Sequence, residues 1–88
     1  MQTLSVFYGI TVSMYREKGS RHHIPHIHAK YGEYTAEYDF NGDRIEGFLP
    51  AGKEKIIIAW IEIHKEDLNA NWELLVQGQP AFRIDPLR

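Results

Sequence analysis

The 88-residue sequence contains no cysteine, which excludes disulfide bonds, thiolate metal ligands and a cysteine nucleophile. Small secreted domains usually need disulfide bonds, so we expect this chain in the reducing cytoplasm. The first residues lack a basic segment followed by a long apolar run, and no signal peptide is expected. No apolar run approaches the roughly 20 residues of a membrane span, so we expect no membrane association.

A strong charge of either sign is also lacking. The formal net charge is −2, which argues against binding of polyanions through bulk charge. The length corresponds to one domain, residues 1–88, with a small hydrophobic core. The aromatic residues, five Tyr, four Phe and two Trp, are expected to supply much of the area of that core.

Alternating apolar and polar residues predict strands in the first half of the chain. An N-terminal hairpin is indicated by apolar alternation on both sides of Tyr8-Gly9. A three-strand meander is predicted over residues 26–31, 34–40 and 43–49. Its two turns are Gly32-Glu33, with glycine first as in a type II′ turn, and Asn41-Gly42. A glycine inside the last of these strands, Gly47, is typical of a β-bulge.

The second half of the chain has helical periodicity. Apolar residues recur at helical spacing from Lys53, and the pattern breaks near residues 67–69, where Asp and Asn favour helix caps. A second helix is predicted over residues 70–76, before Gly78. Residues 82–84 fit a short final strand. The fold class is therefore α+β, with an antiparallel sheet of four to five strands and two C-terminal helices packed on one face.

Four of the five histidines fall within residues 22–28, and two of them, His26 and His28, lie on the same side of a predicted strand. A two-residue turn at Gly32-Glu33 places His28 opposite Glu37 and His26 opposite Asp39, within interaction distance. The next turn places Asp39 opposite Arg44 and Glu37 opposite Glu46. Because the aromatic side of the sheet should meet the helices, the histidine side is expected to face water or a partner.

Three interpretations of this histidine–carboxylate face remain open. In the first, it is a solvated surface whose opposite charges pair across strands. In the second, His26 and His28 bind Zn²⁺ or another transition metal, with His22 as a further ligand from the adjoining loop. A neighbouring carboxylate would then fix the imidazole tautomer.

The third interpretation is acid–base catalysis without a metal. His26 and His28 would transfer protons, while Glu37 and Asp39 would orient the imidazole rings. Positive charges that could bind a phosphodiester, such as RNA, or a protein partner are Arg16, Lys18, Arg21 and Arg44. This set predicts a small ribonuclease or other phosphodiesterase.

The sequence resembles the bacterial domain-of-unknown-function 4160 family over nearly its whole length. The motifs that carry the resemblance are Phe7-Tyr8-Gly9-Ile10, Met14-Tyr15, Pro25-His26-Ile27-His28-Ala29, Tyr31-Gly32, Trp60-Ile61-Glu62-Ile63-His64 and Asn71-Trp72-Glu73-Leu74. The chain departs from the family pattern at Ile24, which replaces a proline, and in a longer loop after Tyr15.

The resemblance implies no assigned activity. Members of the family often lie beside another small gene in the manner of toxin–antitoxin pairs, which favours a component of such a two-gene module. The leading hypothesis is therefore a binding module whose histidine face contacts a small protein partner encoded nearby. The enzyme and the metal-binding protein are the alternatives, and a homo-oligomer is left open.

Overall fold

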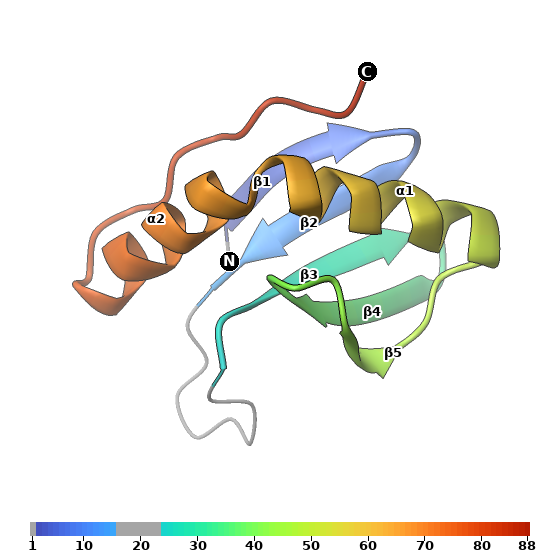
Figure 1. Cartoon of the computed structure of the whole chain (residues 1–88), viewed down its shortest axis with the longest axis horizontal. Coiled ribbons are helices and arrows are strands. Elements are labelled where there is room, and N and C mark those ends of the chain that lie inside the picture. Colours follow the sequence, from blue (N-terminus) through green and yellow to red (C-terminus); the bar gives the residue numbers. More distant parts are fainter. Residues whose placement is uncertain (1, 16–23) are drawn as a thin grey trace.

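The computed structural model describes residues 2–15 and 24–88. In these residues the chain forms a five-stranded antiparallel sheet in the order β1-β2-β3-β4-β5, followed by two helices. The strands are β1 (Gln2–Phe7), β2 (Ile10–Met14), β3 (His26–Tyr31), β4 (Tyr34–Asp39) and β5 (Arg44–Gly47), and the helices are α1 (Ala51–Ile63) and α2 (Lys65–Val76). Both helices lie on one side of the sheet (Figure 1), which confirms the predicted α+β class.

The core lies between α1 and the sheet. Ile57, Trp60 and Ile61 of α1 are buried, and so are Ile27 and Tyr38 on neighbouring strands. This pattern follows from two periods: every second residue of a strand and every third or fourth residue of a helix reach the same layer. Since Ile27 points toward the helices, the Cβ atoms of its neighbours His26 and His28 point toward the opposite face of the sheet.

The predicted turn at Gly32-Glu33 is confirmed, and with it the register of β3 against β4. Tyr31 pairs with Tyr34 in an unbroken antiparallel ladder. Gly32 has a φ of 59°, while Glu33 is not in the left-handed region, as a type II′ turn requires. This turn fixes which side chains of β3 and β4 face each other.

The register of β5 differs in part from the prediction. Glu37 pairs with Glu46 as expected, but Arg44 pairs with Tyr38 rather than Asp39, because the ladder shifts between Glu37 and Tyr38. The extra residue is Ile45, whereas the glycine expected at the bulge, Gly47, pairs with Ala36. Gly47 has a φ of 70°, and a Cβ there would collide with the carbonyl oxygen of Thr35. The predicted pairing of Asp39 with Arg44 is therefore wrong.

The two helices meet earlier than predicted. The break is at His64, which has φ −109° and ψ 22°, and α2 begins at Lys65. The polar residues expected to end the first helix lie inside α2, where the side chain of Asn69 donates to the carbonyl oxygen of Lys65 one turn earlier. Capping residues therefore did not mark the boundary.

The C-terminal segment contacts the core without forming the short strand predicted over residues 82–84. A single ladder-like hydrogen bond joins the Ile84 amide to the Leu4 carbonyl. The Trp60 indole donates to the carbonyl oxygen of Asp85, and Asn71 exchanges two hydrogen bonds with the backbone of Phe82. Side-chain contacts, rather than sheet pairing, hold this segment.

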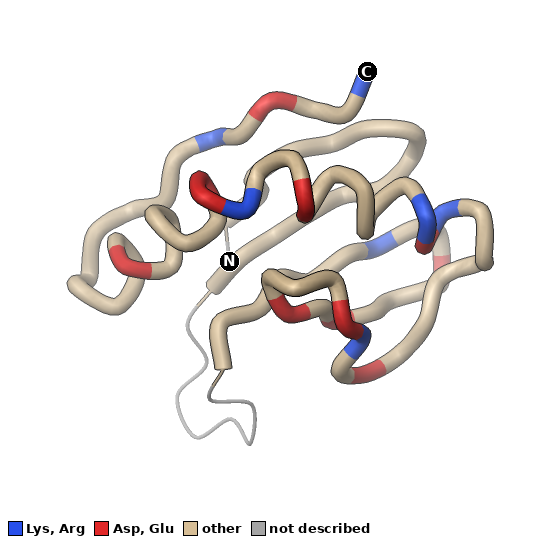
Figure 2. Tube along the Cα trace, in the orientation of Figure 1, with Lys and Arg blue, Asp and Glu red and all other residues tan. Residues whose placement is uncertain are grey.

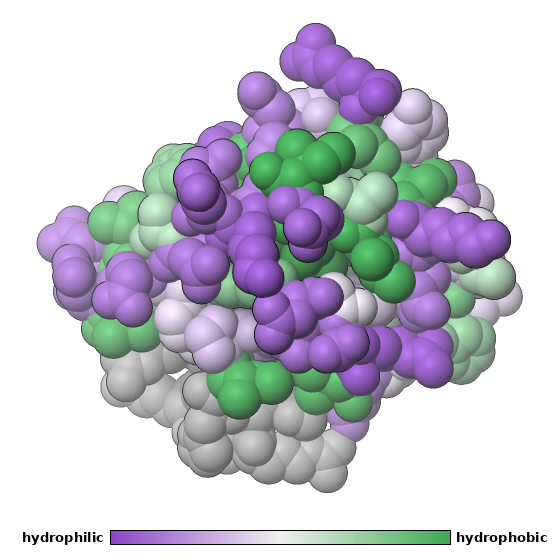
Figure 3. All heavy atoms as spheres, viewed as in Figure 1, coloured by the Kyte–Doolittle hydropathy of each residue, from purple (hydrophilic) through white to green (hydrophobic). Residues whose placement is uncertain are grey.

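On the side of the helices, the described residues present a surface of mixed charge and hydropathy. Lys and Arg alternate with Asp and Glu in the described part of the chain (Figure 2). Hydrophobic residues reach the surface in groups between hydrophilic residues (Figure 3). Among the described residues, no helix is long and apolar enough to span a membrane.

Candidate functional site

His26 lies at the start of β3 with its ring fixed in position. Its Nδ1 donates a hydrogen bond to the carbonyl oxygen of Ile24 at 2.7 Å, because a carbonyl oxygen can only accept. Trp72 of α2 lies against the same ring, with 5.5 Å between centroids. His26 is only 1% exposed. Its Nε2 is thereby directed away from Ile24 and toward β4.

His28, two residues along β3, lies between β4 and the end of β2. Its ring stacks on the ring of Tyr15, with centroids 4.3 Å apart and planes 13° apart. The Tyr15 hydroxyl lies 3.4 Å from His28 Nδ1, so the same tyrosine makes a polar contact. These contacts leave Nε2 of His28 directed toward β4.

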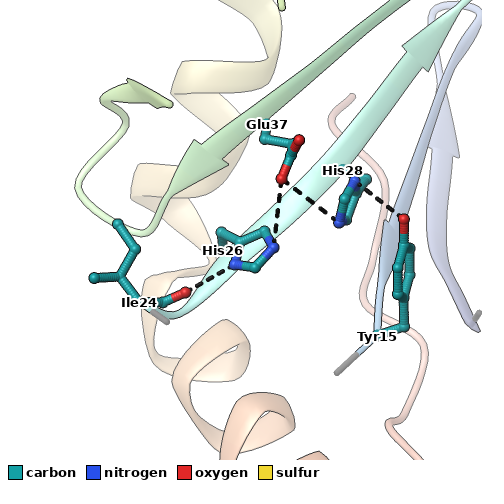
Figure 4. A network of polar contacts seen from close by, with 5 residues as sticks. All are labelled: Tyr15, Ile24, His26, His28 and Glu37. Carbon is teal, nitrogen blue, oxygen red and sulfur yellow. Dashed lines mark hydrogen bonds and ion pairs between the residues drawn. The ribbon is translucent and has the colours of Figure 1, made fainter. Parts of the chain in front are cut away.

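Glu37 of β4 lies between the two imidazole rings (Figure 4). Its Oε1 is 3.5 Å from Nε2 of His26 and 3.9 Å from Nε2 of His28. These three facing atoms are inaccessible to solvent. We call His26, His28 and Glu37 the His–Glu cluster.

The His–Glu cluster has the composition of a transition-metal site. One ligand atom from each residue lies within 4.8 Å of the others. The ligand atoms of a tetrahedral zinc site lie about 3.3 Å apart, so closing the cluster on a metal shortens its separations by at most about 1.5 Å. Imidazole nitrogen and carboxylate oxygen are both ordinary Zn²⁺ ligands.

The surroundings of the cluster match those of metal-bound histidines. A ligating histidine usually donates its other N–H to a carbonyl, carboxylate or water, which fixes the tautomer. Ile24 supplies such a carbonyl to His26, and the Tyr15 hydroxyl, which can donate or accept, lies 3.4 Å from Nδ1 of His28. His26 therefore directs the lone pair of Nε2 toward Glu37, and His28 does the same in the tautomer that carries its proton on Nδ1.

The structure confirms the predicted register of His28 with Glu37 and of His26 with Asp39. The histidine face was expected to be open to water or a partner, but His26 is buried, and the side chains of His28 and Glu37 are only 21% and 16% exposed. Trp72, placed in the core by its helical pattern, is the residue that covers His26.

Two other expected members of the site lie elsewhere. Oδ1 of Asp39 accepts hydrogen bonds from the amides of Asn41 and Asp43, so this carboxylate stabilises the β4–β5 turn. Arg44 forms an ion pair with Glu54 of α1 at 3.2 Å. The expected cationic and metal-binding residues of the loop, Arg16, Lys18, Arg21 and His22, lie outside the described residues.

Sequence reasoning missed three contributors: Tyr15, Trp72 and the Ile24 carbonyl. Tyr15 continues the alternation of β2 by one residue, which places it on the same side as Ser13. The alternation of side chains along β2 was the only feature of the sequence that could have predicted this position of Tyr15. The contacts of Trp72 and of the Ile24 carbonyl depend on chain geometry and had no signal in the sequence.

The fold and the cluster together define a small α+β protein with two histidines and one carboxylate converging on its sheet. The family model described as domain of unknown function DUF4160 matches residues 9–73, and the chain belongs to this family. Neither a curated protein nor a solved structure matches the chain.

Proposed function

We propose that this protein binds a transition metal, Zn²⁺ in the first instance, through His26 Nε2, His28 Nε2 and a carboxylate oxygen of Glu37. The observation that carries the proposal is the convergence of these three ligand atoms within 4.8 Å. Two histidines and a carboxylate on a rigid sheet leave further coordination positions for water or a ligand.

The protonation of His26 supports a cation at this point. Its Nδ1 carries a proton because it donates to Ile24, so in the neutral ring Nε2 bears a lone pair. That lone pair faces an oxygen of Glu37 at 3.5 Å, and two electron-rich atoms in a site without solvent repel each other. A metal ion between the two atoms would bind both the lone pair and the carboxylate oxygen. The second imidazole directed at the same oxygen favours the metal.

A metal-independent ribonuclease or phosphodiesterase has weaker support. Such a mechanism needs two proton-transferring groups in contact with the substrate. His26 is buried between Ile24, Trp72 and Glu37, so of the two histidines only His28 borders an accessible space. The histidine pair therefore fits one coordination site better than an acid–base pair.

The predicted partner protein rests on the family resemblance and stays a prediction, as does the cytoplasmic location. The partner is tested by co-purification: the product of the neighbouring gene is recovered with the wild-type protein and with His28→Ala, and the two amounts are compared. A loss of co-purification in the variant alone would support contact through the His–Glu cluster. Equal recovery of the partner would place that contact elsewhere.

The metal site is tested by titration of the metal-free protein with Zn²⁺ in a calorimeter. We expect one equivalent to bind, and His28→Ala and Glu37→Gln should each weaken the affinity by at least about 100-fold, because each removes a ligand. Glu33→Gln removes a carboxylate from the exposed β3–β4 turn and is the matched control, with unchanged affinity. Equal affinity of all four proteins would exclude the His–Glu cluster as the site.

A further inference from the structure

A groove of about 320 Å³ lies beside the His–Glu cluster, on the face of the sheet opposite the helices. Polar side chains line it in two rows that run across the strands. The first row is Ser13, His28, Glu37 and Glu46, and the second row is Thr11, Lys30 and Thr35. His28 and Glu37 thus belong both to the cluster and to the wall of the groove.

The second row carries donor groups, whereas the first row carries two of the three proposed metal ligands, His28 and Glu37. Lys30 is exposed, and no carboxylate of the described residues forms an ion pair with its ammonium group. It is flanked by Thr11 and Thr35, its direct partners on the two neighbouring strands. One cation between two hydroxyl groups is a set of donors suited to an oxyanion.

We propose that the groove binds one phosphoryl group of a small phosphorylated molecule, held between the metal of the His–Glu cluster and the ammonium group of Lys30. This inference rests on the metal site proposed above. Residues two apart on a strand are about 7 Å apart, which separates the two rows. A phosphoryl group can span such a distance. One of its oxygens would lie about 2 Å from the metal, and another would accept a hydrogen bond of about 2.8 Å from the ammonium group.

The charges in the groove favour one phosphoryl group over a nucleic acid. Lys30 is the only cation among the described residues that line the groove, and Glu37 and Glu46 line it as well. Nucleic-acid binding depends on several cations that neutralise successive phosphates. The metal and Lys30 compensate one dianion, while the carboxylate of Glu46 and the net charge of −2 oppose a longer polyanion.

The test measures binding of inorganic phosphate and of adenosine monophosphate to the zinc-loaded protein at fixed ionic strength. Lys30→Gln should weaken the binding of both by at least about 10-fold while the zinc content stays at one equivalent. Lys55→Gln, at an exposed lysine of α1 on the other side of the sheet, is the matched control and should bind like the wild type. Thr35→Ala should show a smaller loss of the same kind.

The outcomes separate the two proposals. Full zinc content with equal phosphate affinity in wild type and Lys30→Gln would overturn the phosphoryl site and leave the metal site standing. Absence of zinc binding in the wild type would overturn both. A single-stranded RNA oligonucleotide is the third probe. Affinity that rises with its length beyond that of the mononucleotide would overturn the assignment to a single phosphoryl group.

Discussion

Tyr38 shows how a single buried residue connects the sheet to the helix that covers it. Its hydroxyl donates to Glu54 of α1 at 2.8 Å, and the same carboxylate oxygen accepts from Arg44 at 3.2 Å. Burial of the phenol, followed by its hydrogen bond to Glu54, raises the pKa of Tyr38 above its ordinary value of 10.0. The folded protein therefore keeps this phenol neutral under conditions in which the unfolded chain ionises it.

Tyr38→Phe is expected to lower the free energy of unfolding by about 1 kcal/mol at neutral pH, because one hydrogen bond is lost. The raised pKa adds a pH dependence. Its contribution to stability is complete below pH 10 and is lost as the pH rises above 10.0, the value in the unfolded chain. Urea unfolding from pH 7 to 11 should show the wild type losing more stability than Tyr38→Phe above pH 10.

The control for this comparison is Tyr34→Phe, since the ring of Tyr34 is exposed and lies against Phe48 at the edge of the sheet. Its stability profile should run parallel to that of the wild type. A profile of Tyr38→Phe that also runs parallel to the wild type would contradict the buried, neutral phenol.

At the scale of residues, the sequence allowed us to predict which strand positions face each other. It did not allow us to predict which groups each side chain contacts. The pairing of His28 with Glu37 follows from the two-residue turn and the alternation of strands. The burial of His26 depends on Trp72, which lies 46 positions further along the chain, and no local pattern carries that contact. Asp39 was placed opposite His26 correctly, but the turn amides compete successfully for its carboxylate.

At the scale of elements, Gly47 determines how β5 ends against β4. A side chain there would be strained by the positive φ and would also meet the carbonyl oxygen of Thr35. The amide of Phe48 bonds to that same oxygen, so the close approach is part of the ladder. The backbone at Gly47 cannot relax without giving up this hydrogen bond.

Gly47→Ala is therefore expected to lower the free energy of unfolding by about 2–4 kcal/mol. The matched control is Gly32→Ala, which has a similarly positive φ of 59° but open space around the added methyl group. It should cost only about 1 kcal/mol, from the backbone strain alone. Chemical denaturation of both variants measures the difference, and equal losses would contradict the close approach at Gly47.

The elements also show where patterns in the sequence are informative. Gly32, which has a positive φ, correctly indicated the β3–β4 turn because few other residues fit there. Gly47 indicated a bulge in β5, but the extra residue of the ladder is Ile45, two positions earlier. The boundary between α1 and α2 was misplaced because the apolar pattern continues through His64, from Trp60 to Leu68. A break between two helices that keeps the same face buried does not interrupt the apolar periodicity, so the sequence pattern does not reveal it.

At the scale of the whole molecule, stability depends on a small core that spans nearly the entire chain. Leu4 on β1 and Leu68 on α2 are both fully buried and belong to one cluster with residues of α1 and the C-terminal segment. The predicted apolar faces were sufficient to place this cluster, because a sheet and an amphipathic helix bury their apolar faces by packing them against each other. Loss of any part of it should therefore affect the fold as a unit.

Leu68→Ala is expected to lower the free energy of unfolding by about 2–5 kcal/mol, because it leaves a cavity where a side chain is 0% exposed. Ile63→Ala, at a residue that is 64% exposed near the end of α1, should change the stability by less than about 0.5 kcal/mol. Thermal or urea unfolding followed by far-ultraviolet circular dichroism tests the pair. Similar losses in both variants would contradict the packing of α2 on the sheet.

The whole molecule also determines what a ligand can reach. The helices cover one face of the sheet, and the groove beside the His–Glu cluster lies on the other. The register of four strands, β2 to β5, aligns the first row of that groove across the sheet. A metal held by β3 and β4 would thus border a space large enough for a small ligand.

Anomalous diffraction from crystals of the zinc-loaded protein shows whether His26, His28 and Glu37 bind one metal ion. We expect a single strong peak at the zinc edge, about 2.0–2.1 Å from Nε2 of each histidine and in contact with the Glu37 carboxylate. A map without a peak at the cluster, or with its strongest peak at another site such as His64 and Asp67, would contradict it.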